Sequence, residues 1–210
     1  MLTIDKADQN LLSAVYLEVC RDLDAGPAFL GLVTLCRGVS QSLASVFSGP
    51  LGARFDRVKL CGAGCIFWGV ATLAVGLARS HAQILVARAI NGIGLGIVLP
   101  LAFALVADLS PLEVRGRAFG LLFFLNHLGA AASSYSAIEI AATAAGWRVD
   151  FYAAAAVSCV AGLLLYGLGC EPRRLPPGAA TTRSFADDAS DACRALRVRT
   201  FVIILLQARV

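Results

Sequence analysis

The sequence predicts an all-α integral membrane protein, and three observations lead to this prediction. Of the 210 residues, 58% are hydrophobic, and only 15% are charged, whereas a soluble domain carries roughly 25% charged residues. Four uncharged segments contain 19 to 21 residues each: 60–78, 89–107, 118–138 and 151–170. A helix rises about 1.5 Å per residue, so about 20 apolar residues cross a bilayer. Each segment is therefore long enough for a transmembrane helix.

The expected helices follow one another through a bundle that covers residues 1–170. The first, residues 1–19, is expected to be incomplete, because residues 9–19 read as only the last turns of a helix. The second, residues 25–53, is interrupted only by Arg37 and is long enough to tilt. Four further helices are expected at 60–78, 85–107, 118–138 and 151–170.

The chain after the bundle changes character. Residues 171–199 are polar, contain several prolines and arginines, and are expected to form a cytoplasmic linker. Residues 200–210 are apolar again and are expected to begin a seventh helix that the end of the chain cuts off.

Basic residues are unevenly divided between the two ends of the bundle. Eleven lie in the linker and in the loops after the second and fourth helices, whereas three lie in the opposite loops. Cytoplasmic loops carry the excess of Lys and Arg, so we expect the first set to be cytoplasmic. This placement explains the net charge of +4, and no nucleic-acid partner is expected.

The loop at residues 49–59 combines glycine with charge. Gly49 and Gly52 allow helices to approach closely and the chain to turn. We expect Arg54, Asp56 and Arg57 to form a charged gating latch with neighbouring helix ends. The alternative is a topogenic loop, which needs only the basic charges.

A second motif opens the fourth helix. Arg88 precedes 19 uncharged residues, and a lone arginine there has a partner or a function unless it snorkels to the headgroups. Gly92, Gly94 and Gly96 are spaced G-x-G-x-G inside a span, whereas a nucleotide site needs G-x-G-x-x-G after a strand. We therefore interpret these glycines as helix-packing residues.

Polar residues within the expected helices are candidates to line a substrate cavity. Polar groups at membrane depth face protein or a water-filled cavity, and a histidine there can titrate near neutral pH. For Asn126 and His127, the alternative is an interhelical hydrogen bond. The candidates are Arg37, Arg88, Asn91, Asn126 and His127.

The acids near the N-terminus, Asp5 and Asp8, leave two interpretations open. If the first helix begins upstream of Met1, Asp5 lies in or near its apolar part and can face the cavity. If Met1 is the true start, Asp5 is a solvated terminal acid. The sequence supports either interpretation.

Four segments, in this order along the chain, resemble signatures of the major facilitator superfamily. They are its loop signature at 49–59, its fourth-helix signature at 88–96, its second cytoplasmic link at 108–118 and its sixth-helix entry at 146–151. The loop spacing and residues 7–16 resemble the spinster-like branch and its plant and protist relatives. The resemblance implies the N-terminal six-helix bundle of the major facilitator fold, in which two halves rock around a midplane site.

The resemblance also implies a function. A member of this family is a secondary transporter, either a uniporter or proton-coupled, that moves a small organic solute through a lipid bilayer. The spinster-like branch implies a lipid-like or amphiphilic solute. The partner would be a missing C-terminal half or a second copy. In some branches the arginine at the position of Arg88 is tied to proton coupling or to substrate charge. The sequence departs from the family at one position. The family's loop signature has an acidic residue where this chain has Ala53, and Asp56 replaces that acid only in part.

Other classes of function lack support in the sequence. HExxH, GxSxG and Walker motifs are absent, and the seven cysteines form no CxxC pair. We therefore expect no enzyme, no cofactor and no metal. The main alternative is a non-transporting multipass membrane protein, either a truncated product or a scaffold. A channel is disfavoured because the chain has no filter-like segment.

Overall fold

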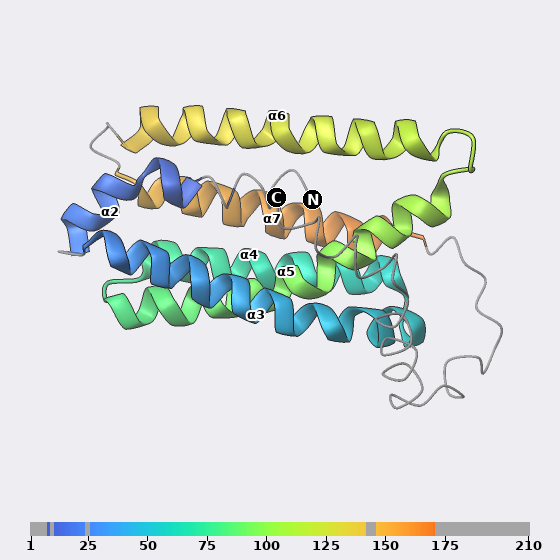
Figure 1. Ribbon diagram of the computed structural model, residues 1–210, viewed down its shortest axis with the longest axis horizontal. Coiled ribbons are helices and arrows are strands. Elements are labelled where there is room, and N and C mark those ends of the chain that lie inside the picture. The colour runs from blue at the N-terminus through green and yellow to red at the C-terminus, as the bar shows by residue number, and fades with distance from the viewer. Residues whose placement is uncertain (1–7, 9–10, 24–25, 142–145, 171–210) are drawn as a thin grey trace, which may run out of the picture.

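The computed structural model describes residues 8, 11–23, 26–141 and 146–170, and all regular structure within these ranges is helical. The helices are α2 (Tyr16–Leu23), α3 (Pro27–Arg54), α4 (Arg57–Leu77), α5 (His81–Leu109), α6 (Arg115–Ala141) and α7 (Arg148–Leu168). Figure 1 shows the long helices running along one common direction, with α6 at one edge and α3 at the opposite edge. The expected linker and the expected seventh helix lie outside the described residues.

Side chains near the helix starts explain where two helices begin. At the start of α4, Asp56 Oδ1 accepts a hydrogen bond from the backbone N–H of Lys59 at 2.9 Å. At the start of α5, Ser80 Oγ accepts one from Gln83 at 3.3 Å. These caps satisfy donors that the first helical turn leaves without partners. Before α7, Gly146 has a φ of 70°, a conformation that glycine adopts without steric cost.

Two close helix pairs, α3 with α5 and α4 with α7, form the body of the bundle, and α4 also packs on α5. Every seventh residue of α4 on the side of α7 is glycine: Gly62, Gly69 and Gly76. A Cβ at Gly62 would lie 2.8 Å from the backbone nitrogen of Tyr166, and one at Gly69 would lie 2.6 Å from Cys159 Sγ. Glycine therefore lets these two backbones approach closely.

Four of the described helices, α3, α4, α5 and α7, are long and apolar enough to cross a membrane. Helix α6 also has 27 residues, but serines and the polar residues Asn126, His127 and Glu139 interrupt its apolar sequence. It packs only sparsely on α5 and α7. Large apolar side chains are exposed on the outside of the bundle, including Leu35, Leu43 and Phe124, as expected for a surface that faces lipid.

A buried apolar cluster lies where α2 meets the neighbouring helices. Val15, Val33, Ile84 and Phe151 are at most 1% exposed within it. These residues come from α3, α5, α7 and the segment leading into α2. The cluster therefore holds the N-terminal segment against the bundle, close in sequence to Asp8.

Candidate functional site

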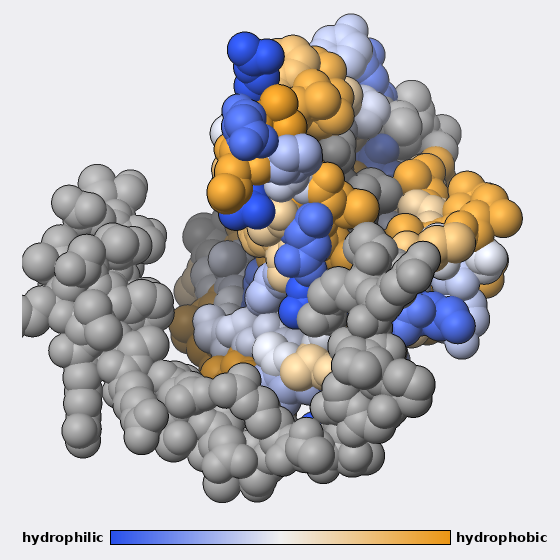
Figure 2. Space-filling model, turned by 90° about the vertical axis from the view of Figure 1, so that its right-hand side faces the viewer, coloured by the Kyte–Doolittle hydropathy of each residue, from blue (hydrophilic) through white to orange (hydrophobic). Residues whose placement is uncertain are grey.

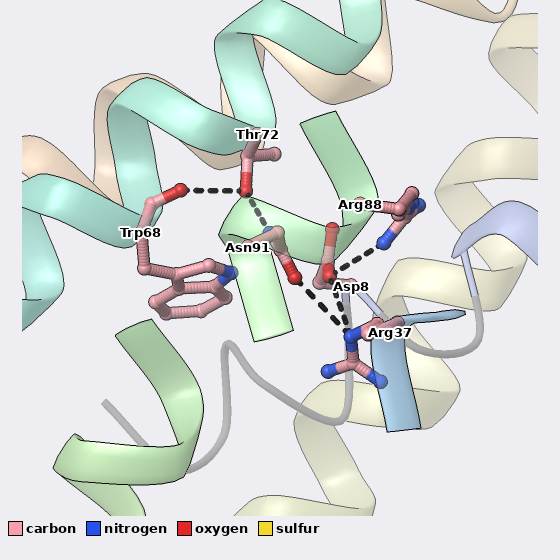
Figure 3. A network of polar contacts seen from close by, with 6 residues as sticks. All are labelled: Asp8, Arg37, Trp68, Thr72, Arg88 and Asn91. Atoms are coloured by element: carbon pink, nitrogen blue, oxygen red, sulfur yellow. Dashed lines mark hydrogen bonds and ion pairs between the residues drawn. The ribbon is translucent and has the colours of Figure 1, made fainter. Parts of the chain in front are cut away.

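A network of charged and polar side chains connects Asp8 with α3, α4 and α5 (Figure 3). Asp8 Oδ2 accepts a hydrogen bond from Arg88 Nη1 at 2.9 Å and lies 4.0 Å from Arg37 Nε. Asp8 is 0% exposed, Arg88 1% and Arg37 9%. Because a buried charge is costly unless it is paired, these three side chains depend on one another inside an apolar bundle.

Neutral groups extend the network from α3 through α5 to α4. Arg37 Nε donates to Asn91 Oδ1 at 3.2 Å, and Asn91 Nδ2 donates to Thr72 Oγ1 at 2.9 Å. Thr72 in turn donates to the backbone carbonyl of Trp68 at 3.0 Å. Asn91 and Thr72 are both 0% exposed. The amide of Asn91 thus uses both its acceptor and its donor, which fixes its orientation.

The pairing of Arg88 is incomplete among the described residues. Its Nε and Nη2 atoms are buried and have no hydrogen-bond partner, and neither has Asp8 Oδ1. The guanidinium carbon lies 5.2 Å from the centre of the Phe151 ring, within the range of a cation–π contact. Arg88 therefore retains two unused donors in a site that is closed to solvent.

Glycines explain how α5 brings the arginines together. A Cβ at Gly92 would lie 2.4 Å from the backbone oxygen of Arg37, and one at Gly96 would lie 2.4 Å from that of Gln41. Gly94 faces α4 instead, where a Cβ would lie 3.3 Å from Trp68 Cβ. Helix α5 therefore approaches α3 at Gly92 and Gly96 and approaches α4 at Gly94, which places Asn91 between them.

Three of the five predicted cavity residues, Arg37, Arg88 and Asn91, belong to this network. Arg88 does not snorkel to a surface, because it is buried and paired with Asp8. Sequence reasoning named Asp8 but did not assign it as the partner of Arg88, which is 80 positions away. The available signal was the expectation that an arginine in a span has a partner. Asp5 lies outside the described residues.

The other two predicted cavity residues lie on α6. Asn126 is 5% exposed, and its Oδ1 atom has no hydrogen-bond partner among the described residues. His127 is exposed, and its Nδ1 atom lies 2.8 Å from the carbonyl oxygen of Phe123 one turn earlier. Within the described part of the chain, neither residue forms a hydrogen bond or ion pair with the Asp8 network.

The predicted latch residues lie at the end of the bundle where α3 meets α4. Arg57 Nη1 donates to Asp108 Oδ2 at 2.6 Å, and its Nε donates to the carbonyl of Gly52 at 3.1 Å. Asp56 caps α4, and Arg54 is exposed. Arg57 thus connects the ends of α3 and α5 through Asp108, which sequence reasoning did not single out as a partner.

The two glycines of this loop have different surroundings. A Cβ at Gly52 would lie 2.3 Å from Leu101 Cδ2 on α5, whereas nothing lies within 4 Å of one at Gly49. Gly52 therefore lies against the tip of the Leu101 side chain, which a larger residue would have to displace. Figure 2 shows this end of the molecule, where hydrophilic residues lie beside apolar ones.

A second ion pair closes the opposite end of the bundle. Arg148 Nη1 donates to Asp22 Oδ2 at 2.5 Å, and Arg148 Nη2 donates to the carbonyl of Ala78 at 3.1 Å. The Trp147 indole also donates to Asp22 at 3.3 Å. These contacts connect α2, α7 and the end of α4. The side chain of Arg148 is 31% exposed and that of Asp22 is 43% exposed, so this pair is partly solvated.

The comparisons with known proteins agree with this architecture. A family model described as the Major Facilitator Superfamily matches residues 4–208. The chain belongs to this superfamily. The niacin transporter NiaP of Acinetobacter baylyi is 32% identical over 150 residues, which cover 70% of this chain and 33% of that protein. The quinolone resistance protein NorA of Staphylococcus aureus is 26% identical over 164 residues, which cover 76% of this chain and 40% of that protein.

Solved structures share the fold. One is a bacterial homologue of the human lysosomal transporter Spinster, in an inward-facing and unoccupied conformation. The match covers 93% of this chain and 46% of the homologue's chain, with a TM-score of 0.69 and 20% sequence identity. Another is the peptide transporter POT in complex with sulfate. The match covers 99% of this chain and 44% of the POT chain, with a TM-score of 0.63 and 19% sequence identity. This superfamily member is thus a multi-pass integral membrane protein, and it spans less than half the length of these relatives.

Proposed function

We propose that this chain forms the N-terminal half of a secondary transporter that moves a small organic solute by alternating access. The observation that carries the proposal is the buried network of Asp8, Arg37 and Arg88 between apolar helices. Ionisable groups at membrane depth are costly, and they mark substrate or ion pathways. Replacing a buried ion pair by apolar side chains is often neutral or stabilising, so stability alone gives little reason for three charges here.

The geometry supports a coupling role for Asp8. One oxygen of this carboxylate faces both guanidinium groups, at 2.9 Å and 4.0 Å. Protonation of Asp8 would remove the charge that holds Arg88 and Arg37 together. Asp8 would then be free to move relative to α3 and α5. This mechanism favours proton coupling over uniport.

The remaining predicted residues complete the proposal. Asn126 and His127 on α6 would line the cavity opposite the network once the second half of the transporter is present. The end with Arg54, Asp56 and Arg57 would face the cytoplasm, where the Arg57–Asp108 pair would restrain α3 against α5. The relatives are described as transporters of niacin and of peptides, and we propose a small organic solute, amphiphilic as the spinster-like resemblance implies. No catalytic step is part of this function.

Reconstitution into proteoliposomes tests the proposal. The full-length transporter would be assayed for uptake of labelled nicotinate and of labelled lysophosphatidylcholine, with and without an inward proton gradient. We expect gradient-dependent uptake of at least one probe. The variant Arg88→Gln should lose it, and the control Arg117→Gln, at an exposed position in the first turn of α6, should keep it. Absence of uptake of both probes under both conditions would favour a scaffold. Uptake that Arg88→Gln leaves unchanged would refute the assigned role of the network.

A further inference from the structure

Thr72, which is not among the residues that the sequence indicated for the site, connects to Arg37 through a chain of hydrogen bonds. Arg37 Nε donates to Asn91 Oδ1 at 3.2 Å, and Asn91 Nδ2 donates to Thr72 Oγ1 at 2.9 Å. Thr72 Oγ1 then donates to the backbone carbonyl of Trp68 at 3.0 Å. Thr72 and Asn91 are both 0% exposed. The three bonds therefore run in one direction, from α3 through α5 to the backbone of α4 (Figure 3).

The chemistry of the two ends fixes this direction. The Trp68 carbonyl only accepts, so the Thr72 hydroxyl uses its single proton there and offers lone pairs to Asn91. The guanidinium Nε only donates, so the amide oxygen of Asn91 must face Arg37. A flipped amide would place donor against donor at Arg37. Thr72 therefore determines which atom of the Asn91 amide faces Arg37, and bonds aligned in this way strengthen one another.

The Nε atom of Arg37 also lies near Asp8. It is 4.0 Å from Asp8 Oδ2, which accepts a hydrogen bond from Arg88 Nη1 at 2.9 Å. Asp8 Oδ1 is buried and has no hydrogen-bond partner among the described residues. Nε carries one proton, and the bond to Asn91 uses it. Asp8 is therefore bonded directly to α5 through Arg88, whereas Arg37 on α3 stays close to it without donating that proton.

Other buried charges do not explain this arrangement. The charged side chains that are buried among the described residues are Asp8, Arg37, Arg88 and Asp150, and their formal charges sum to zero. Asp150 lies on α7, and its Oδ2 atom has no hydrogen-bond partner in the described part of the chain. Arg37 has a further interaction of its own. What Asn91 controls is therefore the position of the Arg37 Nε atom and not the net charge of the network.

We infer that Thr72 is a positioning residue of the proposed transporter: it holds the Asn91 oxygen on Arg37 Nε and so keeps Asp8 bonded to Arg88 alone. This inference rests on the proposed function, in which Asp8 separates from α3 and α5. Without the Thr72 hydroxyl, the Asn91 amide can turn away, and the Arg37 Nε–H can bond to Asp8. Two charge-assisted bonds from two helices would then hold Asp8, which slows the step in which Asp8 moves.

Uptake kinetics of the full-length transporter in proteoliposomes test the role of the hydroxyl, with whichever of labelled nicotinate and labelled lysophosphatidylcholine the unchanged protein takes up. Thr72→Val removes the hydroxyl and keeps the branched shape, whereas Thr72→Ser keeps the hydroxyl. Thr72→Val should lower the maximal uptake rate about threefold to tenfold, the effect of one hydrogen bond, and change the half-saturating concentration by about twofold or less. Thr72→Ser should stay within about twofold of the unchanged protein in both quantities.

Ser158 provides a matched control. It is 1% exposed, and its hydroxyl donates at 2.6 Å to the carbonyl of Ala154 in its own helix. Ser158→Ala therefore removes a buried hydroxyl outside the network and should leave uptake unchanged. An unchanged rate in Thr72→Val, or an equal loss in Thr72→Ser or Ser158→Ala, would overturn the inference.

Thermal unfolding of the purified full-length protein in detergent tests the hydrogen-bond chain without transport. Thr72 acts on Arg37 through Asn91, so the double variant Thr72→Val with Arg37→Gln should lose less Tm than the sum of the single losses, by about 2 °C or more. If Thr72→Val does not fold, Thr72→Ala removes the same hydroxyl and repeats both experiments. Additive losses would overturn the inference. No uptake by the unchanged protein would refute the proposed function alone, and the unfolding cycle would still decide whether Thr72 positions Arg37.

Discussion

Neutralising Asp8 should destabilise this protein far more than neutralising Asp22, although both acids form a close ion pair with an arginine. The Asp8–Arg88 pair has exposed side-chain fractions of 0% and 1%, whereas the Asp22–Arg148 pair has 43% and 31%. In Asp8→Asn, the buried guanidinium group of Arg88 loses the carboxylate with which it pairs, and Arg37 loses a nearby negative charge. Breaking a buried pair in this way costs about 3–5 kcal/mol, whereas an exposed pair contributes about 1 kcal/mol or less.

Thermal unfolding of the purified full-length transporter in detergent measures this difference. For a domain of this size, about 1 kcal/mol corresponds to a Tm change of roughly 2–4 °C, so Asp8→Asn should lower the Tm by about 6–20 °C. Asp22→Asn should lower it by about 4 °C at most. A second variant, Asp8→Asn with Arg88→Gln, should recover part of the loss because it also removes the buried charge of Arg88, whose carboxylate partner Asp8→Asn takes away. Equal losses in the two single variants, or no recovery in the double variant, would refute the argument from burial.

Three further outcomes follow from the packing and the hydrogen bonds. Gly92→Leu should abolish a monodisperse gel-filtration peak, because a Cβ there would lie 2.4 Å from a backbone oxygen of α3. The control Gly49→Ala should leave the peak unchanged, because its Cβ meets nothing within 4 Å. A normal peak for Gly92→Leu would contradict the close approach of α5 to α3. A double-mutant cycle on Arg57 and Asp108, measured by thermal unfolding, should give a coupling free energy of about 0.2–1 kcal/mol, since both side chains are partly exposed. A coupling free energy above this range would contradict the partial exposure of the pair. Asn91→Leu should cost about 1–3 kcal/mol, because Thr72 Oγ1 and Arg37 Nε each lose one hydrogen bond. An unchanged midpoint in thermal unfolding would contradict the network.

The amino-acid sequence by itself determined that this chain is helical and lies in a membrane. Uncharged segments of 19 to 21 residues leave few alternatives, because the bilayer requires every backbone polar group to be paired within its own helix. The motifs at 49–59 and 88–96 likewise resembled the superfamily to which the chain belongs. Both inferences depend on local properties, namely run length, residue type and short spacing.

The sequence also marked part of the site. An arginine before a long apolar run requires a partner, and glycines in that run favour close helix packing. Arg88 and Gly92 could therefore be identified without coordinates. Their partners could not, since Asp8 and Arg37 lie 80 and 51 positions away along the chain, and no local rule connects such residues.

Only the tertiary structure decided which charges meet. Asp8, Arg37 and Arg88 come together because α5 lies against α3 at Gly92 and Gly96, where a side chain would overlap with the backbone of α3. In the packed bundle His127 is exposed on α6, and Asp108 lies beside Arg57. Helical periodicity shows which residues share a face, but the rotation and offset of one helix against another depend on the shapes of both surfaces. The identity of each charged pair is therefore a property of the packed bundle.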